Sequence, residues 1–310
     1  MNTFTTVIGI LAAVYFIFII APGIVAFYAV FTRKSGRSFR EMNIEKTYYA
    51  PYIDEMNAAY DRVTARKPER MTITSFDKTT LAADYYDANS DTTIVLLHGY
   101  NTPPLNNFSV IAAHFLSRGF NLLIPYARGH LDSGGKRTTL GLYERKDLIY
   151  WLDVLVWETV PKNIVIYGMS MGCTTAAMAS SSIGKDSRVK ALILDCGYTS
   201  PYEQLKNDMK RRGMPWMLML PFTNVMCLSK LHEDLHTSAV DALKQCRIPA
   251  LFLHGKADRS VPFALGVKNY EACASEKEAI FVEGADHTMC FTAGGKEVRD
   301  AVDSFIDRAI

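Results

Sequence analysis

The chain has 310 residues, of which 49% are apolar and 21% are charged, a composition typical of a globular protein. Its 34 basic residues almost balance its 32 acidic residues, and the net charge of +2 excludes the strongly basic surface of a nucleic-acid-binding protein. The length permits one large α/β domain or two ordinary domains.

An apolar segment opens the chain. Residues 7–31, "VIGILAAVYFIFIIAPGIVAFYAVF", contain no Asp, Glu, Lys or Arg. A membrane-spanning helix needs about 20 apolar residues, so this segment is long enough to cross a bilayer. A cleaved signal peptide would begin with basic residues and end at a small-residue cleavage site, and the sequence has neither. We therefore expect residues 1–31 to form an uncleaved transmembrane anchor.

The basic residues around this segment predict its orientation. Arg33, Lys34, Arg37 and Arg40 follow the apolar residues, and no Lys or Arg precedes them. The positive-inside rule then places the rest of the chain in the cytoplasm, as a single-pass protein of the cell membrane. The scattered cysteines lack a CxxC motif and indicate neither a disulfide framework nor a zinc site. Deleting residues 1–31 is expected to leave a soluble, active domain.

The next segment, residues 32–70, is polar and rich in tyrosine. The apolar spacing in "YIDEMNAAYDRVTARKPER" predicts one surface helix that ends before Pro68, within a connector between anchor and domain. From Met71 onward, eight short β-rich runs alternate with helical stretches. Such alternation predicts a mostly parallel, eight-stranded sheet flanked by helices, so residues 71–310 form one α/β domain.

A long excursion interrupts the strand pattern. About fifty residues separate the strand that ends at Cys196 from the strand that begins at Ile248, more than one crossover helix requires. The middle of this stretch is rich in Met, Trp and Leu and is broken by Pro215 and Pro221. It predicts a small helical cap at about residues 200–240, over the ligand-binding edge of the sheet.

The run "NIVIYGMSMGCTTAAMAS" places Ser170 between a strand and a helix. Glycines at 168 and 172 allow a tight turn that exposes a serine hydroxyl at a helix N-terminus, the arrangement of a nucleophile. The alternative is a serine that only caps the helix. Cys173, just beyond, is expected to pack inside that helix.

Two later strand ends carry the partners that a serine nucleophile needs. Asp258 follows "ALFLHG", and His287 follows the last strand, in the Ser, Asp, His order of hydrolase triads. His287 would take the proton of Ser170, and Asp258 would orient the imidazole. Asp286 is a rival acid, but its position next to His287 disfavours contact with the far ring nitrogen.

The strand that ends in "LLHGYN" predicts donors for a developing oxyanion. We expect the backbone amides of Tyr100 and Met171 to serve, with Asn101 as the alternative to Tyr100. His98 directly precedes the glycine turn, and we interpret it as a residue that braces the loop through hydrogen bonds rather than as the catalytic base.

Several motifs together resemble the α/β-hydrolase superfamily, near the esterases and serine-aminopeptidase-like hydrolases. "RGHLDSGG" is similar to the Arg-Gly-His-Gly-x-Ser loop of that family, and "LGLYERKDLIYWLDVL" to its Gly-x-x-Glu-x-x-Asp segment; "LHG", "GMSMG", "ALFLHGKAD" and "GADH" extend the similarity over residues 71–310. The resemblance implies the α/β-hydrolase fold, a triad of Ser170, Asp258 and His287, and no metal or organic cofactor.

The sequence departs from the family pattern at three places. Tyr126 replaces a common Asp, Leu131 replaces a glycine, and Asp77-Lys78 replaces an Asp-Gly hairpin turn. None of these removes a catalytic residue, but they weaken any assignment of substrate by analogy. In this family pattern, Glu144 and Asp147 are structural braces.

The leading hypothesis is a membrane-anchored serine hydrolase that cleaves small carboxylic esters, acyl or aromatic, through an acyl-enzyme. A peptidase or amidase with the same triad is the second, and the acidic cluster "HEDLH" at residues 232–236 is its only candidate for binding an N-terminal amine. A non-catalytic binding protein on the same fold is the third, although such proteins usually lose a triad residue. The sequence does not determine an oligomeric state.

Overall fold

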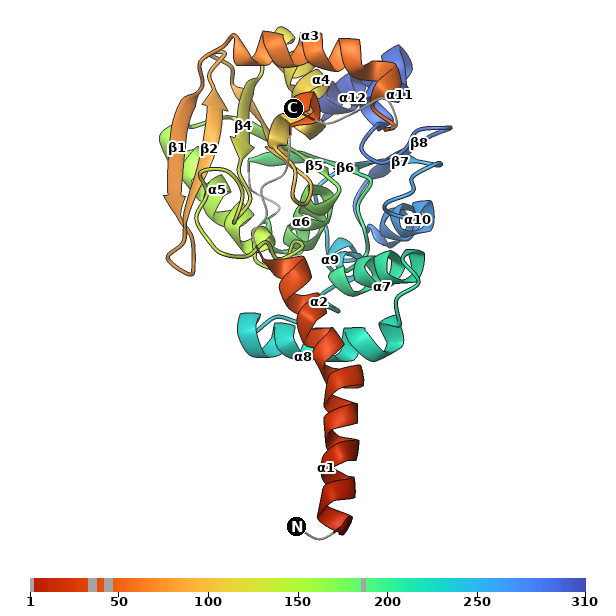
Figure 1. The fold of residues 1–310 in the computed structure, drawn as a ribbon. Coiled ribbons are helices and arrows are strands. Elements are labelled where there is room, and N and C mark those ends of the chain that lie inside the picture. Colours follow the sequence, from red (N-terminus) through yellow and green to blue (C-terminus); the bar gives the residue numbers. More distant parts are fainter. Residues whose placement is uncertain (1–2, 33–37, 42–46, 185–187) are drawn as a thin grey trace.

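The computed structural model describes residues 3–32, 38–41, 47–184 and 188–310 (Figure 1). Its centre is an eight-stranded sheet in the order β1-β2-β4-β3-β5-β6-β7-β8, in which β2 is antiparallel to both neighbours and the other pairs are parallel. The mostly parallel sheet is thus confirmed. The strands are β1 (Glu69–Thr74), β2 (Thr80–Tyr86), β3 (Thr92–Leu97), β4 (Asn121–Pro125), β5 (Asn163–Met169), β6 (Val189–Asp195), β7 (Ala250–Gly255) and β8 (Lys277–Val282).

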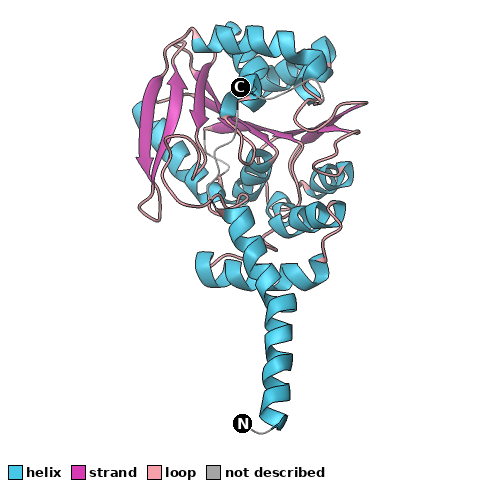
Figure 2. Ribbon diagram, viewed as in Figure 1, coloured by secondary structure: helices cyan, strands magenta, loops and turns pink. Residues whose placement is uncertain are grey.

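Helices cover both faces of the sheet (Figure 2). Every residue of β3 is buried, and its side chains alternate: Ile94 and Leu96 belong to one apolar core, Val95 and Leu97 to the other. This is why the central strands are continuously apolar. One face carries α3 (Ile53–Thr64), α4 (Pro104–Ser117), α11 (Cys290–Ala293) and α12 (Gly295–Ala309), and the other carries α5 (Glu144–Glu158), α6 (Met171–Ala179), α9 (Ala239–Leu243) and α10 (Phe263–Ala272).

The predicted surface helix is α3, and one of its faces is buried in the core of the domain. Its buried residues Met56, Ala59 and Val63 share one face that packs on α4 and the core. Upstream, Phe39 in the short 3-10 helix Phe39–Glu41 is fully buried, and its N–H donates to Asn106. The described parts of the expected connector therefore belong to the α/β domain, because their apolar faces complete its core.

The apolar N-terminal segment forms one helix of 29 residues, Thr3–Phe31, which is long and apolar enough to cross a membrane. It comprises α1 (Thr3–Tyr15), a π-helical turn (Phe16–Ile20) and α2 (Ala21–Phe31). The π-helical turn ends two residues before Pro22, whose missing N–H cannot continue the regular hydrogen-bond ladder. In Figure 1, α1 projects away from the domain, whereas α2 lies against it.

Two helices, α7 (Pro201–Arg211) and α8 (Trp216–Leu231), lie between β6 and β7, where the sequence predicts a cap, and we refer to them as the cap. Pro215 precedes α8, but Pro221 lies inside it without ending it. Helix α2 packs on α8 so closely that a Cβ on Gly23 would lie 2.4 Å from Cβ of Phe222. The expected anchor, residues 1–31, therefore includes a helix, α2, that packs on the domain. Deleting residues 1–31 would remove α2 and expose the surface of α8 that it covers.

Candidate active site

The turn between β5 and α6 presents Ser170 at the carboxyl edge of the sheet. Its φ of 56° and ψ of −116° are rarely adopted by a residue with a side chain. A Cβ on Gly168 would lie 2.4 Å from the carbonyl oxygen of Gly172, and a Cβ on Gly172 would lie 1.9 Å from that of Leu97. The two glycines are therefore required by close backbone approach, which allows α6 to start immediately after the strained serine.

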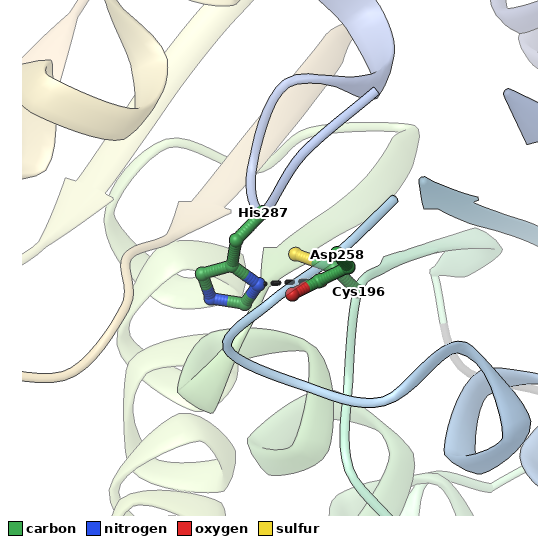
Figure 3. A group of neighbouring side chains, drawn as sticks. All are labelled: Cys196, Asp258 and His287. Carbon is green, nitrogen blue, oxygen red and sulfur yellow. Dashed lines mark hydrogen bonds and ion pairs between the residues drawn. The ribbon is translucent and has the colours of Figure 1, made fainter. Parts of the chain in front are cut away.

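His287 links the other two predicted site residues. Its Nε2 lies 2.8 Å from Oγ of Ser170, and its Nδ1 lies 2.7 Å from Oδ2 of Asp258. Figure 3 shows the imidazole and the Asp258 carboxylate pointing toward each other from the loops that follow β8 and β7. The structure thus brings together, in one hydrogen-bonded chain, three residues that are 29 or more positions apart.

Asp258 is held in place from several sides. Its side chain is fully buried, and its Oδ1 accepts the backbone N–H groups of Ser260 and Val261, both at 2.8 Å. Burial opposes ionisation of this carboxyl group, but hydrogen bonds from His254 and His287 outweigh burial and hold its pKa below the usual range. A charged carboxylate with a fixed orientation therefore faces Nδ1 of His287.

The rival acid, Asp286, has a different partner. Its carboxylate accepts Nε of Arg259 at 2.6 Å and the backbone N–H groups of Arg259 and His287 at 3.1 and 2.7 Å. It therefore contacts the backbone of His287, whereas Asp258 contacts the imidazole. This geometry separates the two acids that the sequence left open.

The loop after β3 also distinguishes between Tyr100 and Asn101, the two candidates for the loop-side oxyanion donor. The N–H of Asn101 donates to Nε2 of His130 at 2.9 Å and is thus engaged. Within the described part of the chain, the N–H groups of Tyr100 and Met171 have no hydrogen-bond acceptor. Tyr100 is therefore the loop residue whose amide remains available next to Ser170, with Met171 in the first turn of α6.

His98 braces the loop, as expected. Its Nδ1 donates to the carbonyl of Gly99 at 2.8 Å, and its Nε2 accepts the N–H of Ala127 at 3.0 Å. Burial, with a smaller contribution from the neighbouring His130, lowers the pKa of His98 to about 3, so the ring is neutral at physiological pH. Both ring nitrogens are engaged with the backbone, which leaves none to act as a base.

The expected braces Glu144 and Asp147 are confirmed as well. The Glu144 carboxylate accepts the N–H groups of Thr139 and Gly141 at 2.7 and 2.9 Å, fixing the loop before α5. Asp147 forms a two-pronged ion pair with Arg128, at 2.8 and 2.6 Å. Both carboxylates are buried, and neither lines the pocket above Ser170.

Two of the departures from the family pattern lie at positions with a positive φ. Leu131 has a φ of 41° and Lys78 a φ of 65°, in the left-handed region that glycine adopts more easily. Each costs roughly 1–2 kcal/mol relative to glycine. The hydroxyl of Tyr126 donates to the carboxylate of Asp84, so this tyrosine ties β2 to the end of β4.

A pocket of about 430 Å³ opens above Ser170, a size within the range of small-molecule sites. Its apolar wall comes from α2, the cap and two loops, and includes Ala26, Val30, Tyr49, Leu140, Leu205 and Met209. The sequence interpretation missed the contribution of α2. The available signal was a row of small residues, Gly23 and Ala26, within an otherwise bulky apolar helix.

Cys196 lies close enough to Asp258 and His287 for their ligand atoms to fall within 4.8 Å of one another (Figure 3). This group does not fit a metal site, because both nitrogens of His287 are already engaged. Burial also raises the pKa of the Cys196 thiol well above its usual value, which disfavours the thiolate that binds metals. Cys173 is likewise buried with a raised pKa, as expected for a packing residue.

Several known proteins are similar to this chain in sequence or fold. Residues 92–219 match the family described as alpha/beta hydrolase fold. The protein YqkD of Bacillus subtilis (strain 168) is 29% identical over 228 residues, which are 72% of this chain and 74% of YqkD. Protein bem46 of Schizosaccharomyces pombe is 26% identical over 231 residues, 74% of this chain and 70% of bem46.

Among solved structures, the Pyrococcus furiosus esterase Pf2001 is similar to this chain with a TM-score of 0.66 at 21% identity, covering 80% of this chain and 94% of the esterase. The family match spans Ser170 and its preceding strand. Fold, family match and relatives agree, and the chain belongs to the α/β-hydrolase superfamily.

Proposed function

We propose that this hydrolase is a serine esterase, with Ser170 as nucleophile, His287 as general base and Asp258 as the acid that orients it. The observation that carries the proposal is the hydrogen-bonded chain from Oγ of Ser170 through the imidazole to the buried carboxylate. The strained backbone of Ser170 supports it, because such strain persists where it serves a site. The pocket above Oγ supplies room for a substrate.

The reaction follows from this geometry. Nε2 of His287 accepts the Ser170 proton while Oγ attacks the ester carbonyl, and the Asp258 carboxylate stabilises the resulting imidazolium. The amides of Tyr100 and Met171 donate to the oxyanion. Collapse of the tetrahedral intermediate transfers the proton to the leaving alcohol and leaves an acyl-enzyme on Ser170. Water, deprotonated by His287, then releases the carboxylic acid and restores the serine.

The contacts of the acidic side chains favour an ester over a peptide substrate. Glu233, in the cluster that could have bound an N-terminal amine, forms ion pairs with Arg145 and Lys146 at 3.0 and 2.5 Å. Asp208 does line the pocket, but it pairs with Arg211 at 2.6 Å. Glu233 and Asp208 are thus already neutralised by cations of the chain itself.

A fluorophosphonate probe tests the nucleophile. We expect it to label the wild type and the control Ser117→Ala, whose exposed serine only donates to His114, but not Ser170→Ala. Hydrolysis of p-nitrophenyl acetate should disappear in the same variant. Equal labelling of Ser170→Ala and wild type, or no labelling of either, would overturn the assignment.

We further propose that α1 anchors the protein in a membrane. The described side chains of α1 are exposed, and they include large apolar residues such as Phe4 and Leu11, exposed by 70% and 63%. So much exposed apolar surface favours insertion into lipid. Of the basic residues that predict a cytoplasmic domain, Arg40 pairs with Asp61, and those at 33, 34 and 37 lie outside the described residues.

Extraction of membranes with alkaline carbonate tests this anchor. The full-length protein should remain in the membrane pellet, since burying the apolar side chains of α1 in lipid is favourable by about 25 cal/mol per Å². A variant that lacks residues 3–15 should be released, because it retains α2 but the remaining apolar helix is too short to span a bilayer. Release of the full-length protein would contradict the anchor.

A further inference from the structure

Helix α2 separates the pocket from the cap helix α8. Its residues Ala26, Ala29 and Val30 line the pocket. On another part of the helix, a Cβ on Gly23 would lie 2.8 Å from the carbonyl oxygen of Met219, and the carbonyl of Gly23 accepts the Thr223 hydroxyl at 3.1 Å. The C-terminal part of the apolar helix is therefore held against the cap while it forms a wall of the pocket.

The end of α2 is also tied to the loops around Ser170. The hydroxyl of Tyr100 donates to the carbonyl of Val30, which links α2 to a residue that lines the pocket together with Ser170. The carbonyl of Phe31 accepts the N–H of Thr138 at 3.1 Å. These contacts fix the pocket wall relative to the nucleophile, so α2 is a structural part of the active site.

The outer face of α8 is apolar. Met217, Leu218, Val225 and Leu228 are exposed by 69%, 44%, 57% and 45%. Figure 1 shows that α8 lies crosswise to α2, at the end of the domain from which α1 projects. An apolar surface at that end continues the exposed apolar surface of α1, so a bilayer that receives α1 would meet α8 at its surface.

The rim beside α8 is basic and aromatic. The amino groups of Lys206 and Lys210 lie 5.3 and 5.1 Å from the ring centre of Trp216, the first residue of α8. Exposed Arg212 lies at the pocket. Trp and basic side chains suit the headgroup level of a membrane and attract anionic lipids. The basic rim and the exposed apolar face of α8 thus both indicate contact with a lipid bilayer.

We propose that α2 and α8 place the pocket mouth at the bilayer surface, and that the substrate is a long-chain acyl ester drawn from the membrane. The acyl chain lies along the aliphatic wall formed by Ala29, Val30 and Met209, with its carbonyl carbon at Oγ of Ser170. Water cleaves this ester to a fatty acid and an alcohol, so the inference rests on the proposed esterase function. It extends that function by naming the class of substrate, a long-chain acyl ester, and its source, the membrane.

Full-length protein in vesicles of phosphatidylcholine and phosphatidylserine provides the test. The substrates are p-nitrophenyl palmitate, held in the vesicles, and soluble p-nitrophenyl acetate. Ala29→Trp fills the wall beside the chain, and we expect it to lower the ratio of kcat/KM for palmitate over acetate by about tenfold or more, the cost of a poor fit in an apolar pocket. Ala12→Trp, at an exposed position of α1, is the matched control and should leave the ratio unchanged.

A second variant tests the surface independently of the pocket. Met217→Glu combined with Val225→Glu places charge on the exposed face of α8, and it should reduce hydrolysis of vesicle-held palmitate about tenfold relative to acetate, since charged side chains disfavour contact with lipid. Labelling of Ser170 by the fluorophosphonate verifies that each variant is folded.

The outcomes separate the two proposals. A wild type that cleaves acetate but not palmitate overturns the inference while the esterase function stands. Palmitate hydrolysis that is unaffected by both the pocket and the surface variants also overturns it. A wild type that cleaves neither ester and takes up no probe refutes the esterase function itself.

Discussion

Replacing Asp258 by Asn tests the proposed triad most directly, because the two side chains have the same shape. In the structure, Oδ1 accepts the amides of Ser260 and Val261 while Oδ2 accepts Nδ1 of His287 at 2.7 Å. An Asn would keep its oxygen on the two amides and turn its NH₂ group toward His287. The imidazole would then carry its proton on Nε2 and could no longer accept one from Ser170.

The expected loss follows from this change of tautomer. An amide in place of a triad acid lowers kcat by roughly 10⁴-fold, which corresponds to about 5.5 kcal/mol of activation free energy. The fold should survive, because the substitution adds no volume and keeps both backbone hydrogen bonds of the buried Asp258 carboxylate. The measurement is kcat for p-nitrophenyl acetate, with active sites counted by fluorophosphonate labelling of the wild type.

Asp286→Asn is the matched control. It loses the ion pair with Arg259, whose side chain is 75% exposed, so the substitution should cost no more than about 1 kcal/mol in stability and change kcat by less than about tenfold. If Asp258→Asn retained more than about a tenth of the wild-type kcat, or if Asp286→Asn lost as much activity, the role of Asp258 would be refuted.

Three further predictions concern residues around the site. Gly172→Ala places a methyl group 1.9 Å from the Leu97 carbonyl oxygen, so it should unfold the nucleophile turn or abolish probe labelling; normal labelling would contradict this. Tyr100→Phe leaves the Val30 carbonyl without its donor and should cost about 1–3 kcal/mol, visible as a lower Tm in detergent; an unchanged Tm would show that this hydrogen bond is not needed. Burial raises the pKa of Asp195 from 3.8 to about 6, so the folded state binds this proton more tightly than the unfolded state; the resulting stabilisation is present below about pH 4 and lost as the pH rises through 6. Asp195→Asn should therefore gain about 3 kcal/mol relative to wild type between pH 4 and pH 8, and a constant difference in unfolding free energy would contradict this.

Much of the site could be predicted because strand ends are visible in the sequence. Apolar runs that stop at a glycine or a polar residue mark the carboxyl edge of a parallel sheet, and Ser170, Asp258 and His287 each follow such a run. The glycines beside Ser170 carry local information, since no larger residue fits where β3, β5 and α6 meet. The bracing role of His98 followed from its place directly before a glycine turn.

Choices between neighbouring residues needed the tertiary structure. Tyr100 and Asn101 are equivalent by position, and the difference arises because His130, from a distant loop, accepts the amide of Asn101. Likewise, Arg259 engages Asp286 and leaves Asp258 for the imidazole. Such preferences depend on hydrogen-bond partners far away in the chain, which local patterns do not contain.

The sequence by itself determined the fold class, the tight strand-to-helix turn at Ser170 and the presence of a long apolar helix, because each depends on local spacing and composition. Only the tertiary structure decided how that helix is used. Its first part is exposed, while Gly23 and Ala26 in its second part are buried between cap and pocket. Side chains that face lipid and side chains that face a protein core have the same apolar character, so composition cannot distinguish an anchor from a wall of the active site.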